Sequence, residues 1–275
     1  MALKLPLRAV TVPTSEPTRV PAGQTWLPGS PILLSMRFIV VDAADARGSV
    51  AVFDDAELLF MEAHSSDEDY SSWLLPAVKR ALSSCSLSLS QLDGYGVCAG
   101  PGSFTGLRVG LTTVKAWAEI HRKPIAAVSR LEALAVGGQP IQEQLVATFM
   151  DARRNQVFAA LYARSVDGLA LVGEEAVTPL EDFVARVEVE AKGQAVRWVT
   201  PDTELLEAQP DWQVLGAKGH VVERAAPPFA LRLGQLAYRK FRKGETTDAL
   251  SLDANYVRRS DAEVFWKGHR SAFKA

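Results

Sequence analysis

The residues best placed for chemistry form a glycine-rich run, Gly100-Pro-Gly-Ser-Phe-Thr-Gly-Leu-Arg-Val-Gly110. Such a run between a strand and a helix often binds phosphate, because a helix start offers unpaired backbone N–H groups. A Walker loop needs Lys directly after its last glycine, whereas Leu107 stands there. The dinucleotide fingerprint needs its glycines one residue closer, and a hydrolase elbow needs glycine where Pro101 stands. None of these three chemistries is predicted.

The run is therefore predicted to shape the backbone. Pro101 and Gly102 favour a turn, and Ser103 is expected to cap the following helix by accepting a backbone hydrogen bond. Gly106 and Gly110 lie four residues apart, so they share one helix face and allow a close backbone approach. Glycine costs a helix about 1 kcal/mol relative to alanine, so we expect something to pack tightly there. Two structures could pack against this glycine face: a partner protein, or the sheet of the protein itself.

Other candidate ligands are scattered along the chain. The histidines and cysteines are His64, His121, His220, His269, Cys85 and Cys98. Their spacing indicates neither a metal site nor a disulfide framework. Asp42 ends the first predicted strand, where a lone acid is usually solvated or caps a turn. The sequence predicts no catalytic residue and no metal site.

Composition indicates an ordinary globular protein. The chain has 275 residues, 48% hydrophobic, and a net charge of −2, so no overall attraction to nucleic acid or to anionic membranes is expected. It lacks an apolar run of about 18 residues, which excludes a transmembrane helix, and its first residues do not resemble a signal peptide. A reducing, cytoplasmic location is predicted.

Residues 1–35 are predicted to form a disordered leader. This segment carries six of the 15 prolines and no sustained hydrophobic periodicity. Met36 directly precedes the first strand, so a misassigned start codon is a further hypothesis for the leader. Intact mass of the natively expressed protein would decide it.

An N-terminal lobe is predicted over residues 36–130. Three strands, 37–42, 48–53 and 57–62, form an antiparallel meander. A helix follows, opened by a capping box of Ser65 and Glu68 and bent by Pro76. A strand over 92–99, the glycine run, a helix over 111–119 and a strand over 124–128 complete the lobe. This β-β-β-α-β-α-β order is the half-unit of actin-like, ribonuclease-H-like folds.

The C-terminal lobe is predicted over residues 131–260, with a frayed tail over 261–275. Its strands are expected over 145–150, 157–163, 169–177 and 195–199, and a late amphipathic helix over 229–243. A helix through Val189 should open with Thr178 as its cap and Pro179 at its first position. The C-terminal lobe is therefore predicted to be shorter than a complete second copy of the β-β-β-α-β-α-β half-unit.

At this point a family resemblance is visible. The glycine run is similar to the motif of the TsaB (YeaZ) family, bacterial tRNA threonylcarbamoyladenosine biosynthesis proteins. Trp73-Leu-Leu-Pro76 with Leu82 resembles the family's first helix. Met150–Phe158 resembles its Asp-Ala-Arg…Glu-Val-Tyr strand, with Gln156 and Phe158 as departures, and Asn255-Tyr-Val-Arg258 resembles its C-terminal Pro-x-Tyr-Leu-Arg segment. The match covers roughly residues 36–263.

The resemblance implies an α/β, two-lobed actin-like fold of the sugar-kinase and heat-shock-protein type, with a shortened second lobe. It implies a non-catalytic scaffold subunit that binds and activates the catalytic paralogue TsaD, joined by the ATPase TsaE. The complex modifies the adenosine beside the tRNA anticodon. ATP or ADP and a metal are then expected on the partner subunits, with none bound by this chain alone. The first two helices of the N-lobe would carry the contact, and the same surface could form homodimers.

The residues themselves favour a non-catalytic protein. The catalytic relative holds its metal with a His-x-x-x-His pair, which is absent here. Active members of the fold cradle phosphate with Asp-x-Gly-Thr after the first strand, where this chain has Asp42-Ala-Ala-Asp45. Asp45 replaces the Thr or Ser usual in the family, and its carboxylate would repel phosphate.

The partner-binding surface is predicted from residue types. Its expected members are Tyr70, Trp73 and Leu74 as anchors, beside a groove of Gly102, Ser103, Phe104, Thr105, Gly106, Arg108, Val109 and Gly110. Alternatively, Trp73 and Leu74 face the sheet, as amphipathic helices normally arrange. Arg108 would donate to a partner carboxylate or to Asp42, or remain a solvated charge.

Two further charge patterns have ordinary explanations. Asp151 and Arg153 are expected to pair with each other. A basic run, Arg239, Lys240, Arg242 and Lys243, lies near a predicted helix C-terminus, where it would compensate the helix dipole. Contact with tRNA is the alternative for that run, disfavoured by the net negative charge.

Two other functions remain open from the sequence. The chain could be an ATP-dependent transferase or a protease of the actin-like superfamily that acts alone. It could also be an interaction module that works mainly as a homodimer. Nucleotide binding and the oligomeric state would separate both from the scaffold function.

Overall fold

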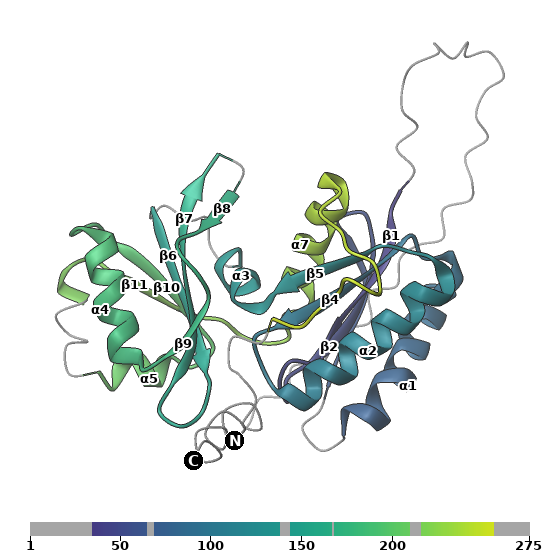
Figure 1. Cartoon of the computed structure of the whole chain (residues 1–275), viewed down its shortest axis with the longest axis horizontal. Helices are drawn as coiled ribbons and strands as arrows, with labels where there is room; N and C mark the ends of the chain where they lie inside the picture. Colours follow the sequence, from purple (N-terminus) through teal and green to yellow (C-terminus); the bar gives the residue numbers. More distant parts are fainter. Residues whose placement is uncertain (1–34, 65–68, 138–143, 167, 210–215, 256–275) are drawn as a thin grey trace, which may run out of the picture. The chain divides into compact units, whose positions relative to one another are not determined.

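The computed structural model describes residues 35–64, 69–137, 144–166, 168–209 and 216–255 (Figure 1). Ser35–Ala275 forms one compact unit. The leader up to residue 34 and the tail over 261–275 lie outside the described residues, so both stay predictions.

The first sheet has five strands in the order β3-β2-β1-β4-β5. The strands are β1 (Arg37–Asp42), β2 (Ser49–Asp54), β3 (Glu57–Ala63), β4 (Gly94–Gly100) and β5 (Ile125–Ser129). The three N-terminal strands pair antiparallel, whereas β4 and β5 run parallel to β1. The predicted meander and the order of elements are confirmed.

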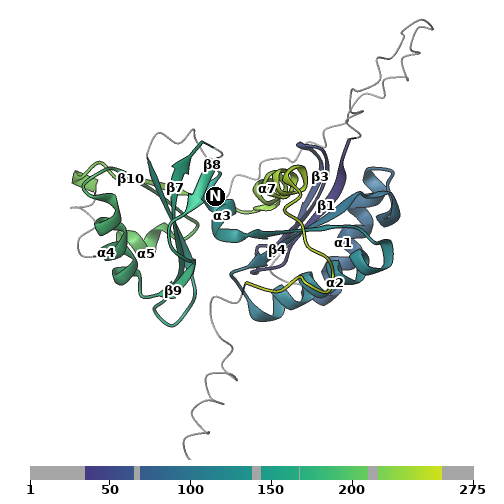
Figure 2. The same ribbon diagram turned by 45° about the horizontal axis from the view of Figure 1, so that its top comes forward.

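Helices cover both faces of this sheet (Figure 2). α1 (Tyr70–Ser84) and α2 (Phe104–His121) lie on one face, where the ring of Tyr95 on β4 packs against that of Trp117 on α2 with centroids 5.8 Å apart. α7 (Ala230–Lys243) covers the other, where Gly94 and Gly96 leave room for Phe241 and Ala237. The segment expected as the C-terminal lobe thus includes a helix that packs on the first sheet, because its apolar side fits the otherwise bare face.

The start of α1 differs from the prediction. Asp69 occupies the N-cap position, and the predicted box residues Ser65 and Glu68 lie outside the described residues. Pro76 does lie inside the helix, on its exposed side. A short 3-10 helix, η1 (Leu89–Gln91), precedes β4 and has a capping box of its own between Ser88 and Gln91.

The second sheet repeats the strand order of the first. Its strands are β6 (Leu145–Asp151), β7 (Val157–Ser165), β8 (Gly168–Leu171), β10 (Val196–Thr200) and β11 (Val221–Arg224), in the order β11-β10-β6-β7-β8. β9 (Ala176–Thr178) also pairs with β7. The single strand predicted over 169–177 is therefore wrong: β8 and β9 are separate, and Gly173 between them has a φ of +78°.

Two described helices belong to the second lobe, α4 (Leu180–Ala191) and α5 (Thr203–Glu207). The predicted cap of α4 is wrong, because Thr178 pairs with Val157 as the last residue of β9 and Pro179 takes the N-cap position. α4 has 12 residues where α1 has 15, consistent with a shortened lobe. None of the helices within the described ranges has the length and apolar character that crossing a membrane requires.

A helix that the sequence did not predict, α3 (Arg130–Ala135), joins the two sheets. It follows β5 directly, and its buried Leu131 and Leu134 pack in a core shared by both lobes. A second core fills the other face of the second sheet, around Trp198 and Phe183. Two sheets of the same order, connected in this way, form the predicted α/β two-lobed actin-like fold.

Candidate partner-binding face

The glycine run connects β4 to α2 as predicted. Ser103 is the N-cap of α2, and its Oγ accepts a hydrogen bond from the backbone N of Gly106 at 3.4 Å. The Gly100–Pro101 peptide bond is cis. Sequence reasoning therefore placed the turn and the cap correctly, although α2 begins at Phe104 rather than at Leu111.

Replacing Ser103 with alanine is expected to cost about 1 kcal/mol of unfolding free energy, because the Gly106 N–H would lose its acceptor. Chemical denaturation measures the difference. Thr105→Ala is the control: Thr105 is an exposed residue two positions later in the same first turn and should change stability by less than about 0.5 kcal/mol. Equal losses in both variants would contradict the cap.

The glycine face of α2 is covered by the protein's own chain. A Cβ at Gly102 would overlap the carbonyl oxygen of Ala44, and one at Gly106 would overlap that of Ala43. The backbone N of Ser103 also donates to the Ala44 carbonyl, at 2.5 Å. The loop after β1 is therefore what lies against these glycines.

Gly106 and Gly110 are buried under that loop, so their predicted place in a partner groove is wrong. Gly110 faces Ala43 and Val41 within the N-lobe. The physical reason is that the glycines make room for residues 43–44, which follow the central strand of the sheet. Of the two alternatives, the protein's own structure is the one that occupies this face.

Below the loop lies a charge cluster in which Asp42 and Arg130 are fully buried and the Asp45 side chain is 26% exposed. Asp42 and Arg130 have no exposed surface, and an Nη2 of Arg130 lies 3.6 Å from Asp42 Oδ2 and 3.0 Å from Asp45 Oδ2. The guanidinium carbon of Arg130 also lies 5.0 Å from the centroid of the Phe229 ring. Arg130, rather than Arg108, is thus the cation near Asp42, because α3 directs it into the N-lobe.

The two carboxylates of this cluster differ in pKa. Burial raises the pKa of Asp42, and the attraction of Arg130 only partly opposes this effect. Burial also acts to raise the pKa of Asp45, but Arg130 and the backbone N–H of Arg47 outweigh it, so the pKa lies below its usual range. Burial lowers the pKa of Arg130, yet the two carboxylates more than compensate and keep it charged.

Three backbone N–H groups of the loop over residues 42–48 are already hydrogen-bonded within the N-lobe. The N–H of Ala44 bonds Asp42 Oδ1 at 3.1 Å, and that of Arg47 bonds Asp45 Oδ1 at 2.6 Å. The N–H of Gly48 bonds the hydroxyl of Tyr70 at 2.8 Å, and the same hydroxyl donates to the Asp45 carbonyl. A phosphate at this loop would have to displace these bonds and approach the Asp45 carboxylate.

Comparison with known proteins assigns the family. A family model described as "TsaD: tRNA N6-adenosine threonylcarbamoyltransferase" matches residues 63–256. The chain is 29% identical over 231 residues to the "tRNA threonylcarbamoyladenosine biosynthesis protein TsaB" of Bacillus subtilis (strain 168), covering 84% of this chain and 98% of that protein. The TsaB of Escherichia coli (strain K12) is 28% identical over 238 residues, with 84% and 97% covered. The chain belongs to the TsaD family, and it is similar to TsaB proteins over nearly their whole length.

A solved structure has the same fold. YeaZ from Pseudomonas aeruginosa is 25% identical and superposes with a TM-score of 0.65, covering 80% of this chain and 99% of that chain. The match to TsaB proteins extends over nearly their whole length, so both lobes share in it. The family resemblance drawn from the glycine run is confirmed.

In this chain of the TsaD family, two of the predicted anchors on α1 are buried. Trp73 is 4% exposed and Leu74 is 1% exposed, so the prediction that they anchor a partner is wrong. They lie on the side of α1 that packs against the sheet, which was the alternative interpretation. Tyr70 is half-buried, and its hydroxyl holds the loop over residues 42–48.

The surface that α1 and α2 expose agrees with the predicted one on α2 and differs from it on α1. On α1 it contains Leu75, which is 56% exposed, together with Ser71, Ser72, Pro76 and Lys79. On α2 it contains Ser103, Phe104, Thr105 and Arg108, with Val109 half-buried. The Arg108 guanidinium lies 3.8 Å above the Phe104 ring centroid, a cation–π contact. We call these exposed residues the α1–α2 face.

Sequence reasoning missed Leu75, although a signal was present. Positions 73, 74, 77 and 78 define the buried side of α1, so 75 and 76 fall on the opposite side of a 3.6-residue helix. An apolar leucine on that outer side indicates a contact surface, whereas the larger Trp73 drew attention to the wrong side. Gly102 is half-buried between the face and the loop.

The other charge predictions have mixed outcomes. The predicted pair of Asp151 and Arg153 is confirmed: the backbone N of Arg153 donates to Asp151 Oδ1 at 2.7 Å, and their side chains lie 3.5 Å apart. The basic run falls in the last turns of α7, where it can compensate the helix dipole. The tail motif begins at Asn255, and its residues 256–258 lie outside the described residues.

Proposed function

We propose that this chain is an accessory, non-catalytic subunit of the machinery that makes tRNA threonylcarbamoyladenosine. The observation that carries the proposal is the match to TsaB proteins over 97–98% of their length. The names of these proteins assign them to this biosynthesis, and the matching family model is that of the transferase TsaD. The catalytic step would then belong to a TsaD partner.

The N-lobe loop supports the non-catalytic part of the proposal. In active actin-like proteins the turn after the first strand receives phosphate, whereas here its N–H groups are bonded to Asp42, Asp45 and Tyr70. Arg130 is committed to the same two carboxylates. ATP or ADP and a metal are accordingly assigned to the partners TsaD and TsaE.

The α1–α2 face is the proposed TsaD-binding surface. Leu75 supplies exposed apolar area, and Arg108 stacked on Phe104 supplies a cation on an ordered aromatic platform. Exposed aromatic and arginine side chains beside an apolar residue are typical of the energetically important part of an interface. The tRNA would be contacted through the complex, and TsaE would join it.

Leu75→Glu is expected to weaken binding to the TsaD of the same genome at least about tenfold, because it buries a charge in the interface. Size-exclusion chromatography with light scattering and calorimetry measure the complex. Val189→Glu on α4, which replaces a valine that is 74% exposed, is the matched control and should bind like the wild type.

The same experiment separates the alternatives. Equal binding by Leu75→Glu and wild type would overturn the α1–α2 face but leave the subunit role. Absence of a wild-type complex, together with tRNA modification by TsaD and TsaE that does not need this chain, would overturn the subunit role. Micromolar ATP binding by the isolated chain would favour a stand-alone enzyme, and a stable homodimer that excludes TsaD would favour the interaction module.

A further inference from the structure

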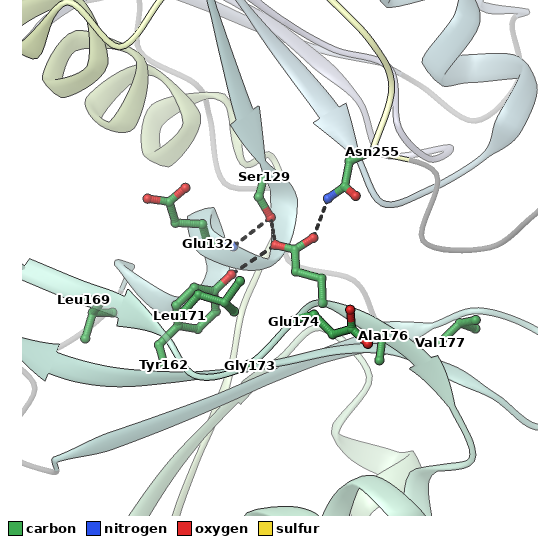
Figure 3. A pocket seen from close by; sticks show the side chains of 11 residues that line it. Ser129, Glu132, Tyr162, Leu169, Leu171, Gly173, Glu174, Ala176, Val177 and Asn255 are labelled. Carbon is green, nitrogen blue, oxygen red and sulfur yellow. Dashed lines mark hydrogen bonds between the residues drawn. The ribbon is translucent and has the colours of Figure 1, made fainter.

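The carboxylate of Glu175 connects three elements of the fold. Glu175 lies in the loop between β8 and β9, and one of its oxygens accepts hydrogen bonds from Ser129 Oγ and from the Tyr162 hydroxyl, the latter at 3.2 Å. The other oxygen accepts a hydrogen bond from Asn255 Nδ2 at 2.5 Å. These donors converge on one point beside the labelled Ser129 and Asn255 (Figure 3).

Two of the donors are fixed to the first sheet. Ser129 is the last residue of β5 and caps α3, accepting a hydrogen bond from the Glu132 backbone N at 3.2 Å. The backbone N of Asn255 donates to the carbonyl of Ala99, on β4, at 2.8 Å. Glu175 itself stands on a loop of the second sheet, so its carboxylate bonds across the two lobes.

The loop that carries Glu175 is also held from its own side. An Nη2 of Arg186, on α4, donates to the Val172 carbonyl at 2.7 Å. Tyr162 comes from β7, the strand with which β8 and β9 both pair. The carboxylate is therefore attached to the body of the second lobe and not to a free segment.

Packing alone leaves this region incompletely filled. A cavity of about 870 Å³ opens beside Glu175, lined by Glu132 of α3, Leu169 and Leu171 of β8, and Val177 of β9. Burial raises the pKa of the Glu132 carboxyl, which faces this cavity region. Apolar contacts are not directional, so the core shared by the two lobes does not by itself fix their relative orientation. Hydrogen bonds to a carboxylate are directional and stronger than neutral ones.

We propose that Glu175 is a clamp that fixes the second lobe against the first, with the dipeptide Ser129–Arg130 as the joint. The two adjacent side chains are bonded in different directions. Ser129 donates a hydrogen bond to Glu175 of the second lobe, and Arg130 forms ion pairs with Asp42 and Asp45 inside the first. The clamp acts within this chain, so it holds whether or not the proposed function is correct.

Distance measurements between spin labels on the two lobes test the clamp. Ile120→Cys on α2 and Val189→Cys on α4 are 73% and 74% exposed positions, and Cys85→Ser removes the half-buried native thiol. We expect one narrow distance distribution in this background. Adding Glu175→Ala should broaden it about twofold and speed amide exchange over residues 172–178 about tenfold, because three bonds are lost together.

Glu174→Ala is the matched control, since Glu174 is the exposed neighbour on the same loop. It should leave both readouts unchanged. Glu175→Gln keeps the shape and an acceptor oxygen but turns its amide N–H toward the Asn255 donor, so it should give an intermediate width. A Glu175→Ala protein that folds and has the wild-type distance distribution would overturn the clamp, as would equal broadening by Glu174→Ala.

Discussion

Replacing Arg130 with methionine is expected to lower the free energy of unfolding by about 3–5 kcal/mol at neutral pH. The substitution keeps an apolar stem of similar length but removes the cation between Asp42 and Asp45. Asp42 is completely buried, so its charge would lose its main compensation. Urea denaturation at pH 7 measures the loss.

The loss should shrink as the pH falls. In the variant, burial without the cation holds the folded-state pKa of the Asp42 carboxyl further above its unfolded value of about 3.9. A carboxyl of that kind is least costly when protonated, so acidification from pH 7 toward pH 5 should recover part of the lost stability. In the wild type the sign is opposite for Asp45: its lowered pKa contributes stability above the unfolded pKa, which is lost as the pH falls through the folded one.

Two further variants make this prediction specific. Asp42→Asn and Asp45→Asn added to Arg130→Met should restore part of the stability, because the charges that need compensation are then absent. Arg153→Met removes an arginine whose side chain is 87% exposed and should cost less than about 1 kcal/mol. A loss below 1 kcal/mol for Arg130→Met, or one independent of pH, would contradict the role assigned to the cluster.

The second large effect is expected at Gly106. Gly106→Ala places a Cβ against the backbone carbonyl of Ala43, which cannot turn aside as a flexible side chain would. The loop over residues 42–48 must shift, and we expect a loss of about 3 kcal/mol, at the upper end of overpacking effects. Thermal and urea unfolding give the value, and amide exchange over the loop should rise in parallel.

Gly110 provides the matched substitution on the same helix face. A Cβ there would lie 3.4 Å from the Ala43 Cβ and 3.6 Å from a Val41 methyl, which are ordinary contacts. Gly110→Ala should therefore be neutral or stabilising by up to about 1 kcal/mol, from helix propensity. The order of the two variants is the test: if Gly110→Ala destabilised more than Gly106→Ala, the loop would not be what covers the glycine face.

The first lobe shows what local sequence signals determine. The meander of β1 to β3, the Ser103 cap and the late helix α7 are each specified by residues within a few positions, through alternation, capping chemistry or helical periodicity. The family resemblance also came from short runs, the glycine run and three supporting stretches, each of which is defined by neighbouring residues alone. Those features needed no knowledge of the rest of the chain.

Contacts between distant segments were decided only by the tertiary structure. The periodicity of α1 separates two sides but does not say which one meets the sheet, so Trp73 was placed outside when burial of its large apolar surface puts it inside. Arg130 lies 88 residues after Asp42 in the sequence, and only the parallel pairing of β5 beside β4 and β1 brings α3 over the loop. The same holds for Glu175, whose partners Ser129 and Asn255 are 46 and 80 residues away. Charge pairs and clamps of this kind depend on the order of strands in the sheet, and local sequence patterns do not predict that order.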